Sequence, residues 1–387
     1  MKELFAYDFL SDQADERINL TSAELSKSEL RDGDLLFARR SFVLEGAGKC
    51  SLVVEPSEAL TFESSMIRAR PHRDLAHSRF LYYYFKSPVG RGRMASIAAR
   101  TAVSGITGSN LSALTIDVPD VAEQRRISAV LVQFDELIEN SRRRVRVLEQ
   151  LTRAIYLEWF VRFRYPAHQS VPLVGSTLGP IPKGWEVMPA SMALTVNPRV
   201  KAPKIATHPF MGMGDLNVQS MICYPSENRS GNSGAKYQNG DTLFARITPS
   251  LENGKTGYVQ SLAADEVRTG STEFIVLRGN RVGSAFTYFL ARTEEFRSNA
   301  IASMVGASGR QRVRRECFDT FLLAVPPVDV AAAFETIAQP IFQEIDAVHR
   351  QSLGLAGLRD FLLPRLVAGQ IDVSGLDLDA LLEVPVA

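Results

Sequence analysis

Residues 33–39 read Gly-Asp-Leu-Leu-Phe-Ala-Arg, and residues 240–246 read Gly-Asp-Thr-Leu-Phe-Ala-Arg. The two copies are 240 − 33 = 207 positions apart, and the same shift, within one residue, relates further pairs along the chain. These pairs are Leu44-Glu45 with Leu251-Glu252, Gly48-Lys49 with Gly254-Lys255, Phe80 and Tyr82 with Phe286 and Tyr288, and Val118-Pro119 with Val325-Pro326. A unit of this length is too large for a solenoid repeat. The sequence therefore predicts two copies of one domain, each followed by a long helix.

The first copy has the pattern of a mixed helix and sheet domain. Leu35–Ala38 and Ser51–Val54 are short apolar runs separated by a glycine-rich turn, which is typical of strands. Phe80–Phe85 is expected to open a buried helix, because its counterpart at 286–291 continues into helix-forming residues. Leu114–Val118, closed by Pro119, is expected to form a further strand.

From Ala122 the apolar residues recur every seven positions. One row contains Ile127, Phe134, Leu148 and Ile155, with Ser141 as its polar member, and the second contains Val130/Leu131, Leu137/Ile138, Val145, Leu151 and Trp159. This pattern is an a/d seam that needs a partner helix to bury it. At 1.5 Å per residue, the helix to Phe163 would be roughly 60 Å long. Asp120 is its candidate N-cap, and Pro166 follows its end.

The second copy is followed by a similar helical pattern. Its apolar positions from Val328 to Leu363 are Phe334, Ile337, Ile341, Ile345, Val348, Leu355, Leu358 and Phe361/Leu362. Pro340 is expected to kink this helix, because proline removes a backbone donor. Gly354 and Gly357 are expected to weaken it.

We therefore expect an α+β fold in which two similar recognition domains are joined by two long helices packed as an antiparallel coiled-coil pair. The expected division is 1–120 for the first domain, 121–164 for the central helix, 165–327 for a linker and the second domain, 328–363 for the C-terminal helix and 364–387 for a tail. Gly184-Trp185 opens the second domain, and its counterpart would precede Met1. The first domain is thus expected to lack about two dozen opening residues, through a trimmed copy or a late start codon.

Composition limits the class of protein. The 387 residues are 45% hydrophobic and 22% charged, which is ordinary for soluble domains. A net charge of +1 excludes a uniformly basic coat and leaves local basic patches open. Cys50, Cys223 and Cys317 lack the spacing of a metal site and are expected to be reduced thiols. No run reaches the roughly 18 apolar residues of a membrane span, so we expect a cytoplasmic protein.

Motifs of catalysis are weak in this chain. Phe210–Gly214 resembles the glycine loop of S-adenosylmethionine-dependent methyltransferases, but no Asn-Pro-Pro-aromatic motif accompanies it, and a strand-edge turn is expected. Gly254-Lys255-Thr256 resembles the end of a phosphate-binding loop, but Pro249 occupies the position of its first glycine. The histidines form no recognisable triad or metal motif. We expect no catalytic residue, no metal site and no cofactor in this chain.

Basic residues at matched positions are the best candidates for a function. Arginine and lysine on loops contact DNA phosphates, and Arg, Asn, Gln and Lys read base edges. The first candidates are Arg39, Arg40 and Lys49 in one copy and Arg246 and Lys255 in the other. The second candidates are two loops, with Thr107, Ser109 and Asn110 in the first and Arg310 and Arg312 in the second. Any single arginine is more often a solvated surface charge, including those at 68, 70, 73, 91, 93 and 100.

Taken together, the motifs resemble the specificity subunits of type I restriction–modification enzymes. They are the repeated Gly-Asp-x-Leu-Phe-Ala-Arg, Leu251–Gly257, Val118-Pro119 followed by Glu123–Ile127, Trp159–Val161, Ile181–Glu186 and Leu362–Ile371. They span nearly the whole chain in the order of the family. The Glu-Gln pair after Val118-Pro119 has no match after Val325-Pro326.

The resemblance implies a DNA-reading subunit that does no chemistry itself. Each domain would read one half of a split sequence in double-stranded DNA. The helices would dock two methyltransferase (M) subunits, and restriction (R) subunits would join the complex. On this resemblance the docking residues are Glu123, Gln124, Arg125, Trp159 and Phe160. Two other functions stay open at this point: a helical scaffold without DNA contacts, and an enzyme with its own methyl-transfer site at 212–214.

Overall fold

The computed structural model of the protein describes residues 2–13, 16–41, 46–99, 104–202, 207–307 and 309–377. The chain forms two compact units, residues 1–140 with 352–387 (unit 1) and residues 141–351 (unit 2). Both boundaries fall within long helices, so each of these helices contributes to both units. The predicted domain boundaries at residues 120 and 327 therefore stay a prediction. Two other predictions lie outside the described residues: the match of Leu44-Glu45 with Leu251-Glu252, and the role of the arginine at 100.

Unit 1 is built on a four-stranded sheet of order β1-β4-β2-β5. Its strands are β1 (Phe9–Leu10), β2 (Leu35–Ala38), β4 (Cys50–Val53) and β5 (Met66–Ala69), and a short ladder joins β3 (Arg40–Ser41) to β6 (Ser104–Gly105). The central strand β2 is antiparallel to β4 and β5, with Leu35 opposite Leu52 and Ala69. Both predicted strands of the first copy are confirmed, because their apolar runs are buried on both faces.

Helices cover the sheet of unit 1 and continue into the long helix. They are α1 (Lys2–Ala6), α2 (Ser22–Ser28), α3 (Ser78–Lys86), α4 (Pro88–Ile97), α5 (Gly108–Ser112) and the start of α6 (Val121–Tyr156). The predicted buried helix is α3, whose residues Phe80–Phe85 all lie in the core. Ser87 caps α4, since its hydroxyl accepts from the Gly90 amide at 3.2 Å.

Unit 2 repeats three adjacent strands of this arrangement, β4-β2-β5 as β15-β14-β17, and adds to them. The repeated sheet has the order β10-β17-β14-β15, from β10 (Leu194–Val196), β14 (Thr242–Ala245), β15 (Thr256–Tyr258) and β17 (Phe274–Gly279). A second sheet, β12-β11-β16-β13, contains β11 (His208–Met211), β12 (Glu227–Arg229), β13 (Ala235–Tyr237) and β16 (Arg268–Gly270). The helices are α7 (Ala190–Ala193), α8 (Ser284–Ala291), α9 (Glu294–Ala302), α10 (Cys317–Thr320) and most of α11 (Val328–Val367), with short turns η2 (Leu157–Val161), η3 (His168–Ser170) and η4 (Met213–Asp215). Two further ladders pair β7 (Leu173–Ser176) with β8 (Gly179–Pro182) and β9 (Glu186–Pro189) with β18 (Leu322–Val325).

The duplication predicted from the sequence is visible in the pairing of the strands. In both units the repeated strand, β2 or β14, lies between two antiparallel neighbours, and a buried aromatic helix, α3 or α8, follows. The second sheet of unit 2 has no counterpart among the described residues of unit 1. The two domains are therefore similar in their shared core but unequal in size.

The predicted strand Leu114–Val118 is wrong. Its counterpart in unit 2, β18, is a strand because β9 pairs with it, with Leu323 opposite Met188. Among the described residues of unit 1, no segment pairs with 114–118, and these residues are extended without a ladder. A strand needs a hydrogen-bonded neighbour, which the local apolar pattern alone does not provide.

In unit 1 the long helices meet around Ile127, Leu131 and Ile138 of α6, which are buried. Leu363, Leu366 and Val367 of α11 join the same hydrophobic cluster as Ile127 and Leu131. Arg359 of α11 donates to Asp135 of α6 at 2.5 Å, and this contact fixes the antiparallel register. Asp120 caps α6, as predicted, since its carboxylate accepts from the Glu123 amide at 2.9 Å.

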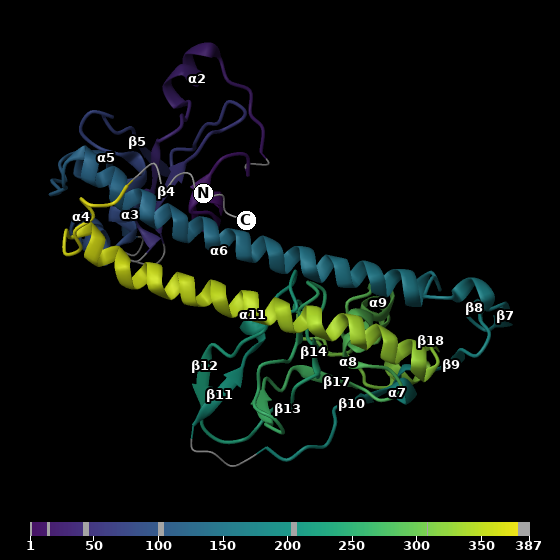
Figure 1. The fold of residues 1–387 in the computed structure, drawn as a ribbon. Helices are drawn as coiled ribbons and strands as arrows, with labels where there is room; N and C mark the ends of the chain where they lie inside the picture. Colours follow the sequence, from purple (N-terminus) through teal and green to yellow (C-terminus); the bar gives the residue numbers. More distant parts are fainter. Residues whose placement is uncertain are drawn as a thin grey trace. The chain divides into compact units, whose positions relative to one another are not determined.

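In unit 2 the buried row of α6 is Val145, Glu149, Thr152 and Tyr156. Tyr156 packs against Phe334 of α11, with ring centroids 6.2 Å apart, and Arg144 pairs with Glu344 at 2.5 Å. The predicted apolar rows were partly wrong: Leu137, Leu151, Ile337, Leu358 and Phe361 are exposed. The helix α11 runs without interruption through Pro340, Gly354 and Gly357 to Val367, so the proline does not end it (Figure 1).

Candidate nucleic-acid interface

The repeated Gly-Asp is a structural anchor in both units. In unit 1, Asp34 is fully buried, and its carboxylate accepts two hydrogen bonds from Arg70, at 2.6 and 2.7 Å. The amide of Arg31 donates to the same carboxylate at 2.8 Å. Gly33, with φ +88°, makes the turn that places Asp34 at the start of β2.

Unit 2 repeats every one of these contacts. Asp241 is fully buried and accepts from Arg278 at 2.7 and 2.8 Å and from the Gln238 amide at 2.8 Å. Gly240 has φ +83°. Burial raises the pKa of Asp241, and the hydrogen bonds from Arg278 oppose that shift. The anchor fixes the start of the strand, so the arginine that follows the strand projects from a defined position.

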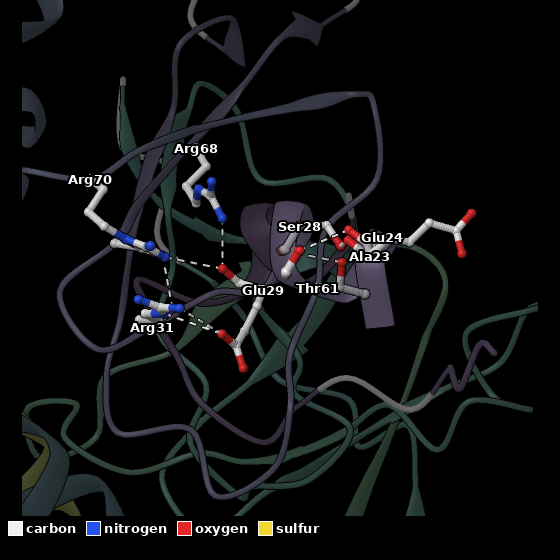
Figure 2. Close-up of polar contacts among 10 residues, drawn as sticks. Ala23, Glu24, Ser28, Glu29, Arg31, Thr61, Arg68 and Arg70 are labelled. Carbon is white, nitrogen blue, oxygen red and sulfur yellow. Dashed lines mark hydrogen bonds and ion pairs between the residues drawn. The ribbon is translucent and has the colours of Figure 1, made fainter. Parts of the chain in front are cut away.

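The arginines at 68 and 70 also have structural partners. Figure 2 shows both side chains converging on the backbone carbonyl of Glu29, with hydrogen bonds of 2.7 Å from Arg68 and 3.1 Å from Arg70. Arg31 donates twice to the Glu29 carboxylate at 3.2 Å. This cluster holds β5 against the end of α2, and its guanidinium groups are engaged within the unit.

At the far end of β2, the structure brings the first and second candidates of unit 1 together. The Ile106 amide donates to the Arg39 carbonyl at 2.9 Å, and β3 pairs Arg40 with Gly105. The loop from Thr107 to Asn110 therefore lies beside the two arginines. Arg40 and the three loop residues, Thr107, Ser109 and Asn110, are exposed. We call these residues, with Arg39, the unit 1 loop cluster.

The polar loop is ordered by its own hydrogen bonds. Thr107 caps α5, since its hydroxyl accepts from the Asn110 amide at 3.1 Å and lies 2.9 Å from the Ser109 hydroxyl. The Asn110 side chain donates to the Ile97 carbonyl at 3.2 Å. Arg39 donates to the Ser64 carbonyl at 3.4 Å. Hydroxyl and amide groups held this way keep acceptors and donors facing solvent, as contacts to base edges require.

The same juxtaposition occurs in unit 2. The Val313 amide donates to the Arg246 carbonyl at 2.9 Å, which is the counterpart of the Ile106–Arg39 bond. The Arg312 guanidinium donates three hydrogen bonds of 2.7 to 3.1 Å to the Glu273 carboxylate, and Arg246 lies 3.9 Å from the same carboxylate. The hydrogen bonds from Arg312 lower the pKa of Glu273, so it is ionised at neutral pH. Arg246, Arg310 and Arg312 form the unit 2 loop cluster, in which Arg310 is exposed.

The two predicted lysines have other partners. The Lys49 ammonium donates to the Phe5 carbonyl at 2.7 Å and lies 5.6 Å from the Phe5 ring centroid. The Lys255 ammonium donates to the Met213 carbonyl at 2.9 Å. Both side chains are half-buried. Each ammonium thus has a backbone partner within its own unit, and the prediction that the two lysines contact phosphates stays a prediction.

Unit 2 also contains a basic pocket that the sequence reasoning missed. It has a volume of about 500 Å³, and its cationic lining residues are Arg199, Lys236 and Arg246. Arg199 is exposed, and the Lys236 ammonium donates to the Gly234 carbonyl at 3.4 Å. Phe274 and Val276 form its apolar wall. Arg199 and Lys236 have no match in the repeat, so only the tertiary fold identifies them.

The predicted docking residues are only partly at the surface. Trp159 and Phe160 are buried in the core of unit 2, where the Phe160 ring lies 5.0 Å from Phe334, and the docking prediction is corrected for both. Gln124 is fully buried: its side chain accepts from the His77 amide at 2.8 Å and donates to the Pro119 carbonyl at 2.8 Å. It has a structural role. Glu123 is half-buried and Arg125 is exposed.

Neither metal chemistry nor membrane insertion is indicated by the described part of the chain. Within it, no group of three His, Cys, Asp or Glu side chains is arranged to hold a metal ion. No helix in these ranges is long and apolar enough to cross a membrane. The Gly212 amide donates to Asp215 at 2.7 Å, and only the three-residue turn η4 follows β11. The long helix that a methyltransferase glycine loop requires does not follow.

The fold and the two loop clusters define a duplicated recognition protein, in which one strand-and-loop arrangement presents basic and polar side chains twice. A family model described as type I restriction modification DNA specificity domain matches residues 17–150. The MjaIX specificity subunit of Methanocaldococcus jannaschii is 24% identical over 97% of this chain and 86% of its own length. The EcoKI specificity subunit of Escherichia coli is 30% identical over 38% of this chain and 33% of its own.

A solved structure supports the fold. The crystal structure of the type I restriction–modification S subunit from M. genitalium covers 93% of this chain and 88% of its own, with a TM-score of 0.50 and 15% identity. These comparisons show that the chain is similar to the specificity subunits of type I restriction–modification enzymes over nearly its whole length.

Proposed function

We propose that this chain is the DNA-reading subunit of a type I restriction–modification complex and recognises a target in two parts. Unit 1 reads one half through its loop cluster, and unit 2 reads the other through its loop cluster and the adjoining basic pocket. The chain itself catalyses no step. Methylation and cleavage belong to the methyltransferase and restriction subunits that it recruits.

The observation that carries this proposal is the repeated placement of a loop against the arginine that follows the anchored strand. The bonds from Ile106 to Arg39 and from Val313 to Arg246 have the same length, 2.9 Å, in the two units. A buried aspartate fixes each strand at its other end. Guanidinium groups suit phosphates and guanine, and the Thr, Ser and Asn of the unit 1 loop suit other base edges. Different loop sequences on one scaffold fit two different half-sites.

The partner surface that we propose lies on the exposed apolar residues of the long helices. In unit 1 these are Leu137, Leu353, Leu358 and Phe361, and in unit 2 they are Val147, Leu151 and Ile337. A helix that buries one apolar face and exposes a second suits association with further helices. Methyltransferase helices packed there would replace Trp159 and Phe160 as the contacts that the sequence predicted.

We further propose that the helices determine the gap between the half-sites. Both α6 and α11 contribute core residues to each unit. A change in the length of these helices therefore changes the length of the segments that connect the two units. The resulting target has unspecified base pairs between two specified parts. Dimeric DNA readers show the same principle, because their half-sites follow the spacing of the recognition elements.

The test is selection of bound sequences from a random DNA library by the chain in complex with its methyltransferase subunits. The expected result is a motif with two specified parts and a gap of fixed length. Replacing the 107–110 loop should change one part and leave the other intact. A complex that binds all sequences equally would favour a helical scaffold without DNA readout.

A further inference from the structure

In unit 2 the start of helix α8 is neutralised by a carboxylate from the long helix. Glu335 of α11 accepts from the Ala285 amide at 3.0 Å and from the Phe286 amide at 3.2 Å. Gln339 donates to the same carboxylate at 2.8 Å. Gly283 precedes the helix, and any side chain there would meet the Glu335 carboxylate. The exposed amides and the positive end of the helix thus have a ligand built into the unit.

In unit 1 that carboxylate is missing at the equivalent position. The long helices α6 and α11 start at Val121 and Val328, so Glu335 corresponds to Ser128. Ser128 lies 2.9 Å from the imidazole of His77, the residue before α3. Among the described contacts, none satisfies the amides of Ser78, Arg79 or Phe80 at the start of α3.

Three arginines gather where the carboxylate is missing. Arg73, Arg79 and Arg125 line a pocket of about 260 Å³ beside the start of α3, which we call the arginine pocket. Within the described ranges none of the three has an ion-pair partner. The one carboxylate in the lining is Asp32, which accepts from the Glu55 amide at 3.2 Å. Three cations against one anion give the pocket an excess of positive charge, and Arg73 and Arg125 are exposed to solvent.

Two of the three arginines have uncharged counterparts in unit 2, and the third, Arg73, matches Arg281, which pairs with Glu186. Arg79 corresponds to Ala285, and Arg125 to Ala332, by the starts of the helices. Unit 2 thus combines Glu335 with alanines at these two positions, whereas unit 1 combines two arginines with a serine at the position of Glu335. In unit 2 the chain itself supplies a carboxylate at the start of the helix. In unit 1 the arginines at the corresponding place are suited to bind a carboxylate from another molecule.

The position of the pocket identifies the source of that oxyanion. The pocket lies at Gly33, where β2 begins, and the unit 1 loop cluster lies where β2 ends. A strand advances roughly 3.3 Å per residue, which separates the two sites by the length of β2. DNA on the loop cluster would contact the opposite end of the strand. The start of α6, which contributes Arg125, belongs to the helix on which we place the partner subunit.

We propose that the arginine pocket of unit 1 binds an acidic side chain of a methyltransferase subunit. This inference rests on the proposed function and adds an asymmetry to it. One methyltransferase subunit is held by a carboxylate inserted between Arg79 and Arg125 at the start of α3. The equivalent place in unit 2 is already filled by Glu335, so the subunit that docks there is held without this contact.

The experiment measures binding of the methyltransferase subunit of the same system to the full chain carrying Arg79→Gln and Arg125→Gln. We expect the dissociation constant of one of the two binding events to rise by about tenfold or more, because charge-assisted hydrogen bonds are lost. Raising the salt concentration should shrink the difference from wild type. Arg17→Gln, which removes one positive charge from an exposed ion pair with Glu58, is the control for each single replacement and should bind like wild type.

A second variant copies the arrangement of unit 2 into unit 1. His77→Gly with Ser128→Glu should place a carboxylate at the start of α3 and compete with the partner, with a similar loss of affinity. Far-UV circular dichroism reports whether each variant is folded, and the glutamine variants keep the test decisive if this one is not.

Three results would overturn the inference. Methyltransferase binding by the glutamine variants that equals wild type would exclude a carboxylate in the pocket. Loss of DNA affinity with unchanged methyltransferase binding would assign the pocket to a DNA phosphate. Equal weakening of both binding events would remove the asymmetry. Sequence selection by the wild-type complex, measured in parallel, tests the proposed function separately.

Discussion

Replacing either buried aspartate of the repeated anchor should destabilise the protein by a similar amount. Asp34→Ala and Asp241→Ala each remove a carboxylate that accepts two hydrogen bonds from an arginine and one from a backbone amide. Removing one partner of a buried ion pair costs about 3–5 kcal/mol. The arginine side chains keep 39% and 26% of their exposure, so water can solvate them after the change. The lower end, about 3 kcal/mol, is expected for both variants.

The measurement is urea unfolding of the full chain followed by far-UV circular dichroism, with the free energy of unfolding compared with wild type. Two compact units can unfold in two transitions, so each variant should shift the transition of its own unit. Arg17→Gln is the control, since an exposed ion pair contributes little to stability.

A loss below about 1 kcal/mol in either aspartate variant would contradict the reasoning. It would mean that the repeated Gly-Asp is retained for another reason than holding the strand. A large loss in one unit and none in the other would show that the matching contacts do not have matching energies.

Three further outcomes are expected. Lys255→Ala should lower the free energy of unfolding by about 1 kcal/mol and leave the salt dependence of DNA binding unchanged. Arg40→Gln should reduce the slope of log affinity against log salt concentration by about one. The reverse pattern in binding titrations would contradict both assignments. Leu151→Glu should prevent one methyltransferase subunit from assembling while the fold is retained, as judged by light scattering and circular dichroism; normal assembly would remove this face from the partner surface. Glu273→Gln should destabilise the protein near neutral pH, because the pKa of Glu273 is lowered in the folded state. That stability is present above the ordinary glutamate pKa of about 4.3 and is lost as the pH falls through the folded value, so the difference from wild type in urea unfolding should shrink in acid; a difference that persists in acid would exclude an electrostatic cause.

The features that sequence predicted well are those that local patterns encode. The strands at 35–38 and 242–245 are continuous apolar runs with a glycine turn before them, and the structure confirms them. The repeat also predicted that Arg39 and Arg246 are equivalent, and each lies beside a loop whose amide donates to its carbonyl; their contact with DNA stays a prediction. Because the sequence contains two copies of the domain, residues that match between them indicate the shared fold, and segments that differ indicate the variable loops.

Other features depend on partners that are distant in sequence. The acceptor of Lys255 is a backbone carbonyl 42 positions earlier. Every residue has a backbone carbonyl, so no sequence motif predicts this contact. Trp159 and Phe160 are expected to dock a partner because of the family resemblance, yet both are part of the core of unit 2, and their burial depends on segments distant in sequence. The strand expected at 114–118 has the right apolar pattern, but pairing depends on a neighbouring segment. Arg199 and Lys236 come together only through the tertiary fold.

Synthesis of unit 1 begins before that of unit 2, but unit 2 is the first to have all of its residues. Unit 2 is one uninterrupted stretch, whereas unit 1 needs residues from both sides of it. Leu363, Leu366 and Val373 complete the core around Ile127 and Leu131, and they are translated more than two hundred residues later. The nascent chain must therefore carry an incomplete unit 1, with its apolar face unprotected, until residues 352–373 have been synthesised. A premature stop after residue 351 would release a chain with a whole unit 2 and an incomplete unit 1, which chaperones and proteases would treat as unfolded.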